Sequence, residues 1–324
     1  MRRLFLSAIL MLAAISQASA IGNNFVEIVY NGSSATVNIA SNISSYITNN
    51  SNGSHVSLVQ SADFQGNTTG EITYILTGSS TDGEFYLEGA YKCTIELDGL
   101  TLTNPSGPAL NIQNGKRVKI SAESGTTNTL TDGVNELYNG CIHCKGHTEL
   151  KGKGTLNIVG NSRHALYSKE YVEIKNLTLN ITAAKKDGIH CQQYFLMESG
   201  TVNISGVQDD GIQVELRGTE STGITTDHED EDTGNFYMAA GKLTISGYSG
   251  KAVKADGAIT LSGGTVNFNS SAMEEYAGIK SAKADSHSSF KKVCDLSGRA
   301  LNGRKASGLY IAKKGGQALK VLSK

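Results

Sequence analysis

The sequence of 324 residues has no tryptophan, two prolines and 5 cysteines, and its charges nearly cancel, with 29 basic and 30 acidic side chains. A nearly neutral chain has no electrostatic reason to bind nucleic acid, for which a basic domain is expected. Cysteines without a recurring spacing imply no disulfide framework. Beyond the N-terminal segment no hydrophobic run is long enough to cross a membrane, so we expect no transmembrane segment.

The N-terminus has the features of a secretory signal peptide. Arg2 and Arg3 precede an apolar run that ends at Ile15, and Ala18-Ser19-Ala20 follows it. A basic start, a short apolar segment and a small-residue cleavage site are the features that secretion signals share. We therefore expect residues 1–20 to be a signal peptide and the mature protein to be secreted, extracellular or at the cell surface.

Glycine is abundant, at 37 residues, and occurs with many threonines, serines and asparagines, a composition typical of short strands joined by tight turns. In the central part of the chain, apolar residues recur every 23 residues. One series is Leu156, Leu179 and Val202, and it resumes at Leu243 and Val266 after an 18-residue insertion. A second series has the same step: Leu166, Ile189 and Ile212. Two independent series with one step predict a repeat architecture.

Within each repeat, apolar and polar residues alternate, as in Leu179-Asn180-Ile181. Alternation predicts strands with one buried face, about three to a repeat and with no room for a helix. Strands that stack coil upon coil form a parallel β-helix, in which equivalent side chains lie about 4.8 Å apart. We predict an all-β fold, a single-stranded parallel β-helix (solenoid) with coils of about 23 residues, over residues 71–280. Residues 21–70 are expected to form an N-terminal leader and cap.

Three kinds of stretch carry a family resemblance. They are the segment Gly125 to Gly133, the Asp-Gly-Ile turns at 187–189 and 210–212, and the acidic run His228 to Gly234. With the alternating coils they resemble the secreted right-handed β-helix family of carbohydrate-binding domains, whose fold is shared with pectate-lyase-like enzymes. The resemblance implies a right-handed β-helix that binds plant-type or acidic polysaccharide with the support of calcium and without catalysis.

The C-terminal part has a resemblance of its own. The stretch Val293 to Arg299, then Gly308 to Ile311 and a lysine-rich end, is similar to the C-terminal sorting tails of type IX-secreted proteins. The resemblance implies the type IX secretion machinery as a partner, while the alternative is a solvated basic tail. We interpret residues 281–324 as a linker and this sorting-like tail.

The repeat also places acidic turn residues above one another. Four turn residues share one column: His164, Asp187, Asp210 and Lys251. Asp187 and Asp210 would lie about 5 Å apart, where two carboxylates repel unless a cation or a base lies between them. Because Ca²⁺ binds several carboxylate and carbonyl oxygens, Asp187, Asp209 and Asp210 are predicted calcium ligands. Alternatively, each aspartate caps backbone amides of its turn and pairs with Lys186 or Lys251.

The 18-residue insertion contains a second acidic cluster. Its predicted calcium ligands are Asp227, Glu229, Asp230 and Asp232. Neighbouring carboxylates repel when no cation is bound, and loops rich in oxygen ligands bind hard cations. The spacing is not that of an EF-hand, and acidic runs in loops are often only solvated, so both interpretations remain open.

One outward column starts a strand of each coil and would run as a stripe along one face. We call this column the stripe, and its residues are the predicted carbohydrate-binding residues: His143, Tyr167, His190, Gln213 and Lys254. Aromatic faces stack on sugars, while imidazole, amide and ammonium groups donate to hydroxyl or uronate oxygens. A repeating ligand such as a polysaccharide suits a repeating surface, and the alternative is a polar face without a ligand. The absence of tryptophan argues against binding to flat crystalline cellulose.

The segment Cys141-Ile142-His143-Cys144 suggests a zinc site, but the repeat argues against it. Cys144, Ser168 and Cys191 form one inward column of small residues, so Cys144 is expected in the core. It would lie two coils, or about 10 Å, from Cys191, too far for a disulfide.

Three functions are compatible with these patterns. The first is a monomeric, non-catalytic carbohydrate-binding protein. The second is a calcium-dependent pectate-type lyase, which would need Lys186 or Arg163 as the base that removes the proton next to a uronate carboxylate. The third is a structural surface adhesin.

Overall fold

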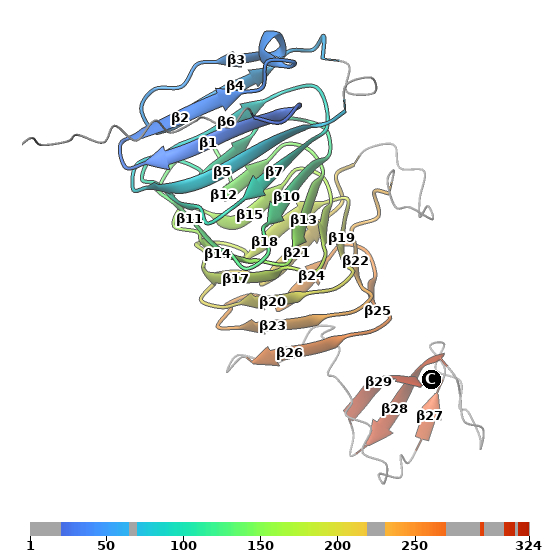
Figure 1. Ribbon diagram of the computed structural model, residues 1–324. Coiled ribbons are helices and arrows are strands. Elements are labelled where there is room, and N and C mark those ends of the chain that lie inside the picture. The colour runs from blue at the N-terminus through green and yellow to red at the C-terminus, as the bar shows by residue number, and fades with distance from the viewer. Residues whose placement is uncertain are drawn as a thin grey trace, which may run out of the picture.

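The computed structural model describes residues 21–64, 70–218 and 231–269, together with three short strands in the C-terminal part. The chain is all-β and winds into a parallel β-solenoid of about 8 turns, with coils of about 25 residues (Figure 1). The predicted fold class is therefore confirmed. Coils of 23 residues occur where Leu156 pairs with Leu179, whereas Leu130 lies 28 residues before its partner Ile158. The predicted signal peptide lies outside the described residues.

Each coil contributes three strands, one to each face of the solenoid. The first face is a nine-stranded sheet that begins with β3 and β4, and its remaining strands are β6 (Glu84–Glu88), β9 (Leu110–Ile112), β12 (Gly140–Cys144), β15 (His164–Ser168), β18 (Ile189–Gln192), β21 (Ile212–Glu215) and β24 (Val253–Ala255). The second face comprises β7 (Cys93–Leu97), β10 (Val118–Ala122), β13 (Thr148–Gly152), β16 (Val172–Ile174), β19 (Tyr194–Met197), β22 (Asn235–Met238) and β25 (Ile259–Leu261). The third face comprises β8 (Thr101–Asn104), β11 (Thr127–Asp132), β14 (Thr155–Val159), β17 (Thr178–Ala183), β20 (Thr201–Ile204), β23 (Lys242–Ser246) and β26 (Thr265–Asn269).

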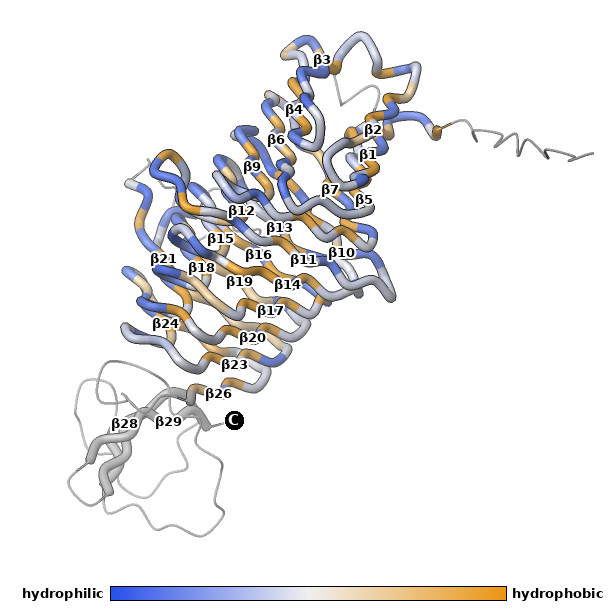
Figure 2. Tube along the Cα trace, turned by 90° about the vertical axis from the view of Figure 1, so that its left-hand side faces the viewer, coloured by the Kyte–Doolittle hydropathy of each residue, from blue (hydrophilic) through white to orange (hydrophobic). Residues whose placement is uncertain are grey.

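The core lies inside the coils and is built from one side of every strand. Inward side chains such as Leu179 and Ile181 are fully buried, while Asn180 between them remains partly accessible. Figure 2 shows this alternation as hydrophobic and hydrophilic bands along each strand. Phe195 and Phe236 stack in parallel on successive coils, with ring centroids 4.9 Å apart. Burial of these repeated apolar columns is what holds the coils together.

The stacking register agrees with the sequence prediction. Leu166, Ile189 and Ile212 occupy successive coils of the first face. On the third face Asn157, Asn180 and Asn203 form what we call the asparagine ladder. The Nδ2 of Asn180 donates to Oδ1 of Asn157 at 2.9 Å, and Asn203 donates to Asn180 at the same distance. The side-chain amides of successive coils therefore satisfy one another's hydrogen-bonding groups.

The N-terminal end of the stack is covered by the segment that the sequence assigned to a leader and cap. It contains β1 (Phe25–Asn31), β2 (Ser34–Ile39), the short 3₁₀ helix η1 (Ser44–Tyr46), β3 (Ile47–Asn49) and β4 (His55–Gln60), and it is followed by β5 (Ile72–Ser80). β1 pairs in parallel with β5 and antiparallel with β2, and β3 pairs antiparallel with β4. An antiparallel partner at the first coil covers backbone groups that an open edge would present to other chains.

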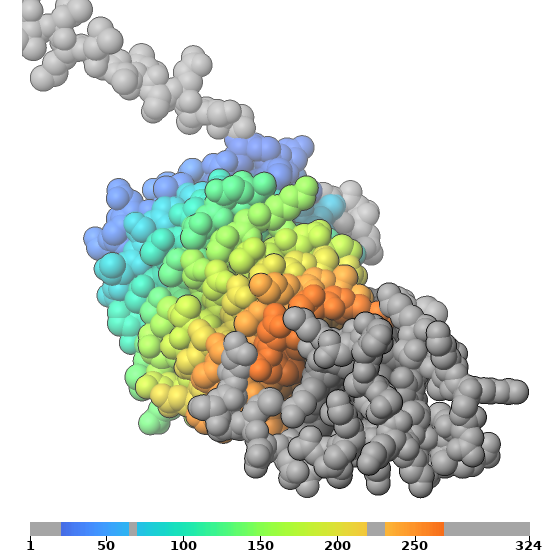
Figure 3. All heavy atoms as spheres, turned by 90° about the horizontal axis from the view of Figure 1, so that it is seen from below, coloured from blue at the N-terminus to red at the C-terminus, as the bar shows by residue number. Residues whose placement is uncertain are grey.

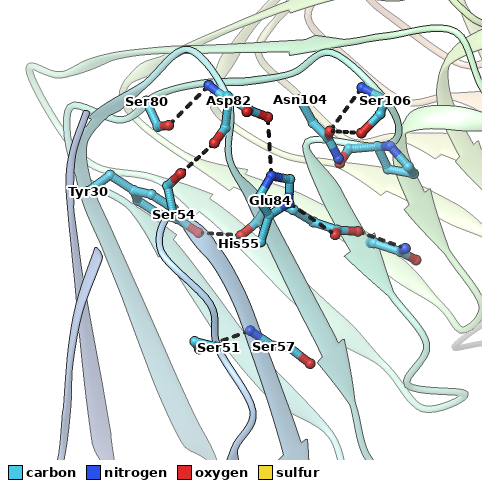
Figure 4. A network of polar contacts seen from close by, with 12 residues as sticks. Tyr30, Ser51, Ser54, His55, Ser57, Ser80, Asp82, Glu84, Asn104 and Ser106 are labelled. Carbon is cyan, nitrogen blue, oxygen red and sulfur yellow. Dashed lines mark hydrogen bonds and ion pairs between the residues drawn. The ribbon is translucent and has the colours of Figure 1, made fainter. Parts of the chain in front are cut away.

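Polar contacts fasten this cap to the first coils (Figure 4). The buried hydroxyl of Tyr30 donates to the backbone oxygen of Glu84 at 2.9 Å, and the Ser54 hydroxyl donates to the backbone oxygen of Asp82. His55 Nε2 lies 3.2 Å from the Asp82 carboxylate, and its Nδ1 lies 3.8 Å from that of Glu84. Each contact joins segments more than twenty residues apart, so the cap is held by tertiary contacts rather than by local turns.

At the other end, β24, β25 and β26 form the last coil, which Figure 3 shows in orange in front of the earlier coils. Three further strands pair antiparallel with one another: β27 (Lys292–Cys294), β28 (Gly308–Lys314) and β29 (Gln317–Ser323). They lie in the part that the sequence assigned to a sorting-like tail. Among the described residues, no helix has the length and hydrophobicity needed to span a bilayer.

Candidate functional site

The stripe is in register along the first face. His143 pairs with Tyr167, Tyr167 with His190, His190 with Gln213, and Gln213 with Lys254. The same column continues toward the N-terminal cap through Asn111 and Tyr86, which the sequence analysis missed because the earlier coils have a longer and less regular spacing. The stripe therefore extends over seven successive coils of one face: Tyr86, Asn111, His143, Tyr167, His190, Gln213 and Lys254.

The rings in the middle of the stripe stack on one another. The centroids of His143 and Tyr167 lie 5.2 Å apart with an interplanar angle of 12°, and those of Tyr167 and His190 lie 5.4 Å apart. His143 and Tyr167 are half-buried, whereas His190 and Gln213 are each only 8% exposed. Although all these residues point outward, His190 and Gln213 therefore offer a ligand little accessible surface. In the middle of the stripe the accessible rings are His143 and Tyr167, and Tyr86 nearer the cap is also partly accessible.

His143 is uncharged near neutral pH. Burial lowers the pKa of its imidazole to about 4, and its Nδ1 accepts a hydrogen bond from the backbone N–H of Asn139 at 3.2 Å. With Nδ1 as the acceptor, Nε2 carries the proton and is a neutral donor. Hydroxyl and carboxylate oxygens of a sugar are suitable acceptors for such a donor.

A second outward column runs beside the stripe. Lys145 and Lys169 are exposed, and each directly follows the paired residues Cys144 and Ser168. The next member of this column in the described part is Gln192, which pairs with Glu215. Neither lysine is among the predicted site residues, although the repeat spacing would have placed both beside His143 and Tyr167. They give the middle of this face a positive charge.

The predicted column of turn residues is also present, and we call it the turn column: His164, Asp187, Asp210 and Lys251. Its members are linked by bonds from backbone to side chain. The Asp187 N–H donates to His164 Nδ1, the Asp210 N–H donates to Asp187 Oδ1, and the Lys251 N–H donates to Asp210 Oδ1. The side chains of His164, Asp187 and Asp210 therefore each cap the backbone of the following coil. This agrees with the amide-capping alternative, but the donor belongs to the next coil rather than to the same turn.

Glycine follows each aspartate because the coils approach closely there. A Cβ on Gly188 would lie 2.7 Å from the backbone oxygen of Gly211, and one on Gly211 would lie 2.5 Å from that of Ala252. Real Cβ atoms do not approach oxygen so closely, so only glycine fits without a backbone shift. The Asp-Gly-Ile turns are thus explained by packing and capping together.

Asp187 lies between two histidines. Its Oδ2 is 3.1 Å from His164 Nδ1 and 3.0 Å from His190 Nδ1, and all three side chains are buried. Burial alone would raise the pKa of the Asp187 carboxyl, but the contacts with both imidazoles and the bond from the Asp210 N–H hold it well below its usual value. Burial lowers the pKa of His164. Asp187 thus pairs with these two histidines.

Asp209 and Asp210 continue the acidic group. One oxygen from each of Asp187, Asp209 and Asp210 can be chosen so that all three lie within 4.8 Å of one another. Burial and the neighbouring carboxylates of Asp187 and Asp209 raise the pKa of Asp210, although the Lys251 N–H and Lys254 oppose this. Lys254 Nζ lies 3.6 Å from Asp210 Oδ2. The negative charge of the three aspartates is therefore only partly compensated.

The acidic insertion is described only at its end. Asp227, Glu229 and Asp230 lie outside the described residues, whereas Asp232 is buried and accepts a hydrogen bond from the backbone N–H of Arg217 at 2.9 Å. Arg217 in turn contacts the carboxylate of Glu170, in the turn between β15 and β16. These contacts join the two described ends of the insertion and connect them to the coil of β15.

The structure also locates the residues that a zinc site at the cysteines or a lyase would need. Cys144 and Cys191 are buried in one inward column, and burial raises the pKa of both thiols, to about 11 for Cys144. The zinc interpretation of residues 141–144 therefore finds no support at Cys144. Lys186 is exposed next to Asp187, while the guanidinium of Arg163 donates to Oδ1 of Asn139 at 3.0 Å.

Comparisons with known proteins point to carbohydrate. A model of the family described as carbohydrate-binding domain-containing protein matches residues 65–303. A solved structure of a polysaccharide lyase-like protein from C. thermocellum, a gadolinium derivative, superposes with a TM-score of 0.54 and 18% sequence identity. The match covers 76% of this chain and 94% of that chain. At this identity the likeness shows a shared fold and nothing about chemistry. No curated protein matches the sequence.

Proposed function

Because the chain belongs to the family of carbohydrate-binding domain-containing proteins, we propose that it binds an acidic or plant-type polysaccharide with the support of calcium and does not cleave it. The observation that carries this proposal is the stripe. It is an in-register column that repeats once per coil along one face. A linear polymer of sugars also repeats, so several coils can each contact one part of the same chain.

The middle of the stripe has the chemistry that a uronate-containing chain requires. Tyr167 offers a partly accessible ring, and His143 offers a neutral N–H donor. Lys145 and Lys169 lie alongside and are exposed, so they are available to pair with carboxylates of the ligand. Two cations one coil apart favour an acidic polysaccharide over a neutral one.

Calcium has a suitable donor set at the turn column. The hard cation Ca²⁺ takes 6–8 oxygen ligands, and Asp187, Asp209 and Asp210 can supply carboxylate oxygens. Burial and the repulsion of the neighbouring carboxylates raise the pKa of Asp210, and a cation would relieve this repulsion. When bound, the ion would supply positive charge beside the stripe. Asp227, Glu229, Asp230 and Asp232 of the insertion remain proposed ligands of a second site.

The cellular setting belongs to the same proposal. The signal-peptide pattern of residues 1–20 supports an extracellular or cell-surface location, where polysaccharides are found. The sorting-like pattern from Val293 onward supports export through the type IX machinery. We expect a monomer, because the first coil of the solenoid is covered by the chain's own strands β1 to β4.

Retention on immobilised polygalacturonate in the presence of Ca²⁺ tests the proposal. Replacing Lys145 and Lys169 together by alanine should reduce retention at least ten-fold, and Tyr167→Ala should also reduce it. Lys242→Ala is the matched control, since Lys242 is an exposed lysine on the third face. It should be retained like the wild-type protein. Equal retention of all variants would show that the ligand does not bind the stripe.

Two further measurements test whether binding requires calcium and whether the protein cleaves the polymer. A chelator should weaken retention of the wild-type protein, and Asp209→Asn should abolish this dependence on calcium. A lyase would produce unsaturated ends that absorb ultraviolet light when it is mixed with polygalacturonate and Ca²⁺. We expect no such increase, and a sustained increase that disappears in Lys186→Ala would replace binding by catalysis. An adhesin would neither be retained nor cleave the polymer.

A further inference from the structure

We propose that His164, Asp187 and His190 form a binding site for a borderline divalent metal ion such as Zn²⁺, which shares only Asp187 with the proposed calcium site. These residues come from two successive coils of the first face, where the turn column meets the stripe. The inference rests on their geometry and does not depend on the binding of a polysaccharide.

The three ligand atoms are already gathered. One atom from each residue can be chosen so that all lie within 4.8 Å of one another, and Asp187 Oδ2 is 3.1 Å and 3.0 Å from the two Nδ1 atoms. Ligands that bind zinc at about 2.0–2.2 Å in tetrahedral geometry are separated from one another by little more than these distances. A metal ion could therefore enter with small side-chain rotations.

The chemistry of the donors selects the type of metal. Two imidazole nitrogens and one carboxylate oxygen suit zinc, copper, nickel or iron, whereas calcium prefers oxygen ligands alone. Asp209 and Asp210 are not part of this group, and the two histidines are not part of the acidic group. Asp187 belongs to both groups, so the bound ion decides which set of partners it uses.

A second carboxylate supports the interpretation. The other ring nitrogen of His190, Nε2, lies 3.4 Å from Glu215 Oε2. Metal-binding histidines usually donate their remaining N–H to a carboxylate, which fixes the tautomer and orients the ring. With Nε2 donating to Glu215, Nδ1 of His190 would offer its lone pair to a metal ion bound beside Asp187.

Without a metal, one contact in the cluster is poorly matched. His164 Nδ1 faces both the backbone N–H of Asp187, at 3.2 Å, and the Asp187 carboxylate, at 3.1 Å. One nitrogen carries either a proton or a lone pair, so it can satisfy the carboxylate or the N–H but not both. Buried polar groups are normally satisfied, and a mismatch of this kind is expected where an ion belongs. A cation between Nδ1 and the carboxylate would be bound by both atoms and would take the Nδ1 lone pair from the Asp187 N–H.

Cobalt substitution tests the site, because Co²⁺ bound by nitrogen and oxygen in tetrahedral geometry absorbs visible light. The full mature chain is freed of metal with a chelator and titrated with Co²⁺ and then with Zn²⁺. We expect one equivalent of Co²⁺ to give visible bands that Zn²⁺ removes by displacement. Zn²⁺ should also raise the melting temperature of the metal-free protein.

Variants then identify the ligands. His164→Gln and His190→Gln should each abolish the cobalt bands, and Glu215→Gln should weaken zinc binding roughly 10- to 100-fold, as is usual for a residue that orients a ligand. Asp209→Asn should leave zinc binding unchanged. The matched control is His147→Gln, since His147 also pairs with a carboxylate, that of Glu170, but lies outside the cluster.

The proposal would be overturned if the wild-type protein gave no tetrahedral cobalt bands, and this result is independent of how the variants fold. It would equally fail if His164→Gln and His190→Gln, folded by circular dichroism, bound zinc as tightly as the wild type. Loss of polygalacturonate retention with intact zinc binding would contradict the proposed function alone.

Discussion

The asparagine ladder and the turn column share one geometry but differ in chemistry. In the ladder, Asn180 donates to the coil above it and accepts from the coil below it, so the amides close on one another. In the turn column, Asp187 and Asp210 only accept, and their donors are backbone N–H groups, imidazoles and Lys254. A stacked amide column needs nothing else, whereas a stacked carboxylate column needs donors or cations from outside it.

This difference separates structural from functional columns in a solenoid. A residue that can both donate and accept gains from an identical neighbour in the next coil. A carboxylate placed above a carboxylate gains no hydrogen bond from its neighbour's side chain, and its pKa rises through burial and the nearby acids, as at Asp210, unless other donors outweigh them, as at Asp187. Repeated acids therefore mark positions where another group must contribute. Substitutions that exchange amide and carboxylate test this rule directly.

The largest effect is expected at Asp132, a carboxylate in a column with an amide. Asp132 pairs with Asn104, and its Oδ2 is buried without a hydrogen-bond partner. Burial raises the pKa of Asp132 to about 6, so ionising it at neutral pH costs about 3 kcal/mol of stability, since one pKa unit corresponds to 1.36 kcal/mol. Asp132→Asn should thus raise the free energy of unfolding at pH 8 by about 1–3 kcal/mol.

The effect of Asp132 on the free energy of unfolding should depend on pH. A carboxyl whose pKa is raised by folding stabilises the protein fully below pH 4, and this contribution is lost as the pH rises through about 6. Urea denaturation at pH 4 and pH 8 should therefore show the advantage of Asp132→Asn only at pH 8. The mirror variant Asn104→Asp should be destabilised at pH 8, because the Asn104 Nδ2 donates to Pro108 O. A destabilised Asp132→Asn would mean that Oδ2 has a partner.

The regular coils could be predicted from the sequence because their register follows from counting. Leu156, Leu179 and Val202 occupy paired positions, as the 23-residue step requires, and so do Cys144, Ser168 and Cys191, at steps of 24 and 23. Counting fixes which residues are stacked, since consecutive coils share one backbone geometry. Counting along the repeat therefore predicts the stripe and the turn column.

Contacts between columns could not be predicted in this way. The approach of His164 and His190 to Asp187 depends on side-chain rotamers within the turn, which the repeat does not encode. The strands β1 to β4 were also beyond prediction in detail, because their spacing is irregular and their pairing is partly antiparallel. Nor does counting show that Gln213 is nearly buried although it points outward.

A smaller effect is expected from breaking the ladder. Asn180→Ala removes two amide–amide bonds and should lower the free energy of unfolding by about 1–2 kcal/mol, since each such bond contributes about 0.5–1.5 kcal/mol net and both are only partly buried. Asn267→Ala is the matched control. Asn267 occupies the same column but is exposed and follows Thr244, which interrupts the ladder. It should change stability by less than about 0.5 kcal/mol. Equal losses in the two variants would show that the ladder adds nothing.

The smallest effect is expected at Asp210, and it depends on calcium. Asp210→Asn keeps an acceptor for the Lys251 N–H and removes one of three neighbouring negative charges. The only ion pair lost among the described contacts is the 3.6 Å approach of the partly exposed Lys254, and such pairs contribute little. In chelator at pH 8 the melting temperature should therefore rise, by less than the roughly 2–4 °C that 1 kcal/mol gives in a protein of this size. In excess calcium the order should reverse, because the wild-type carboxylate gains a ligand that the amide binds more weakly. A variant that is more stable than the wild type in both buffers would mean that no cation supports this column, and the acids would then be compensated by histidine and backbone donors alone.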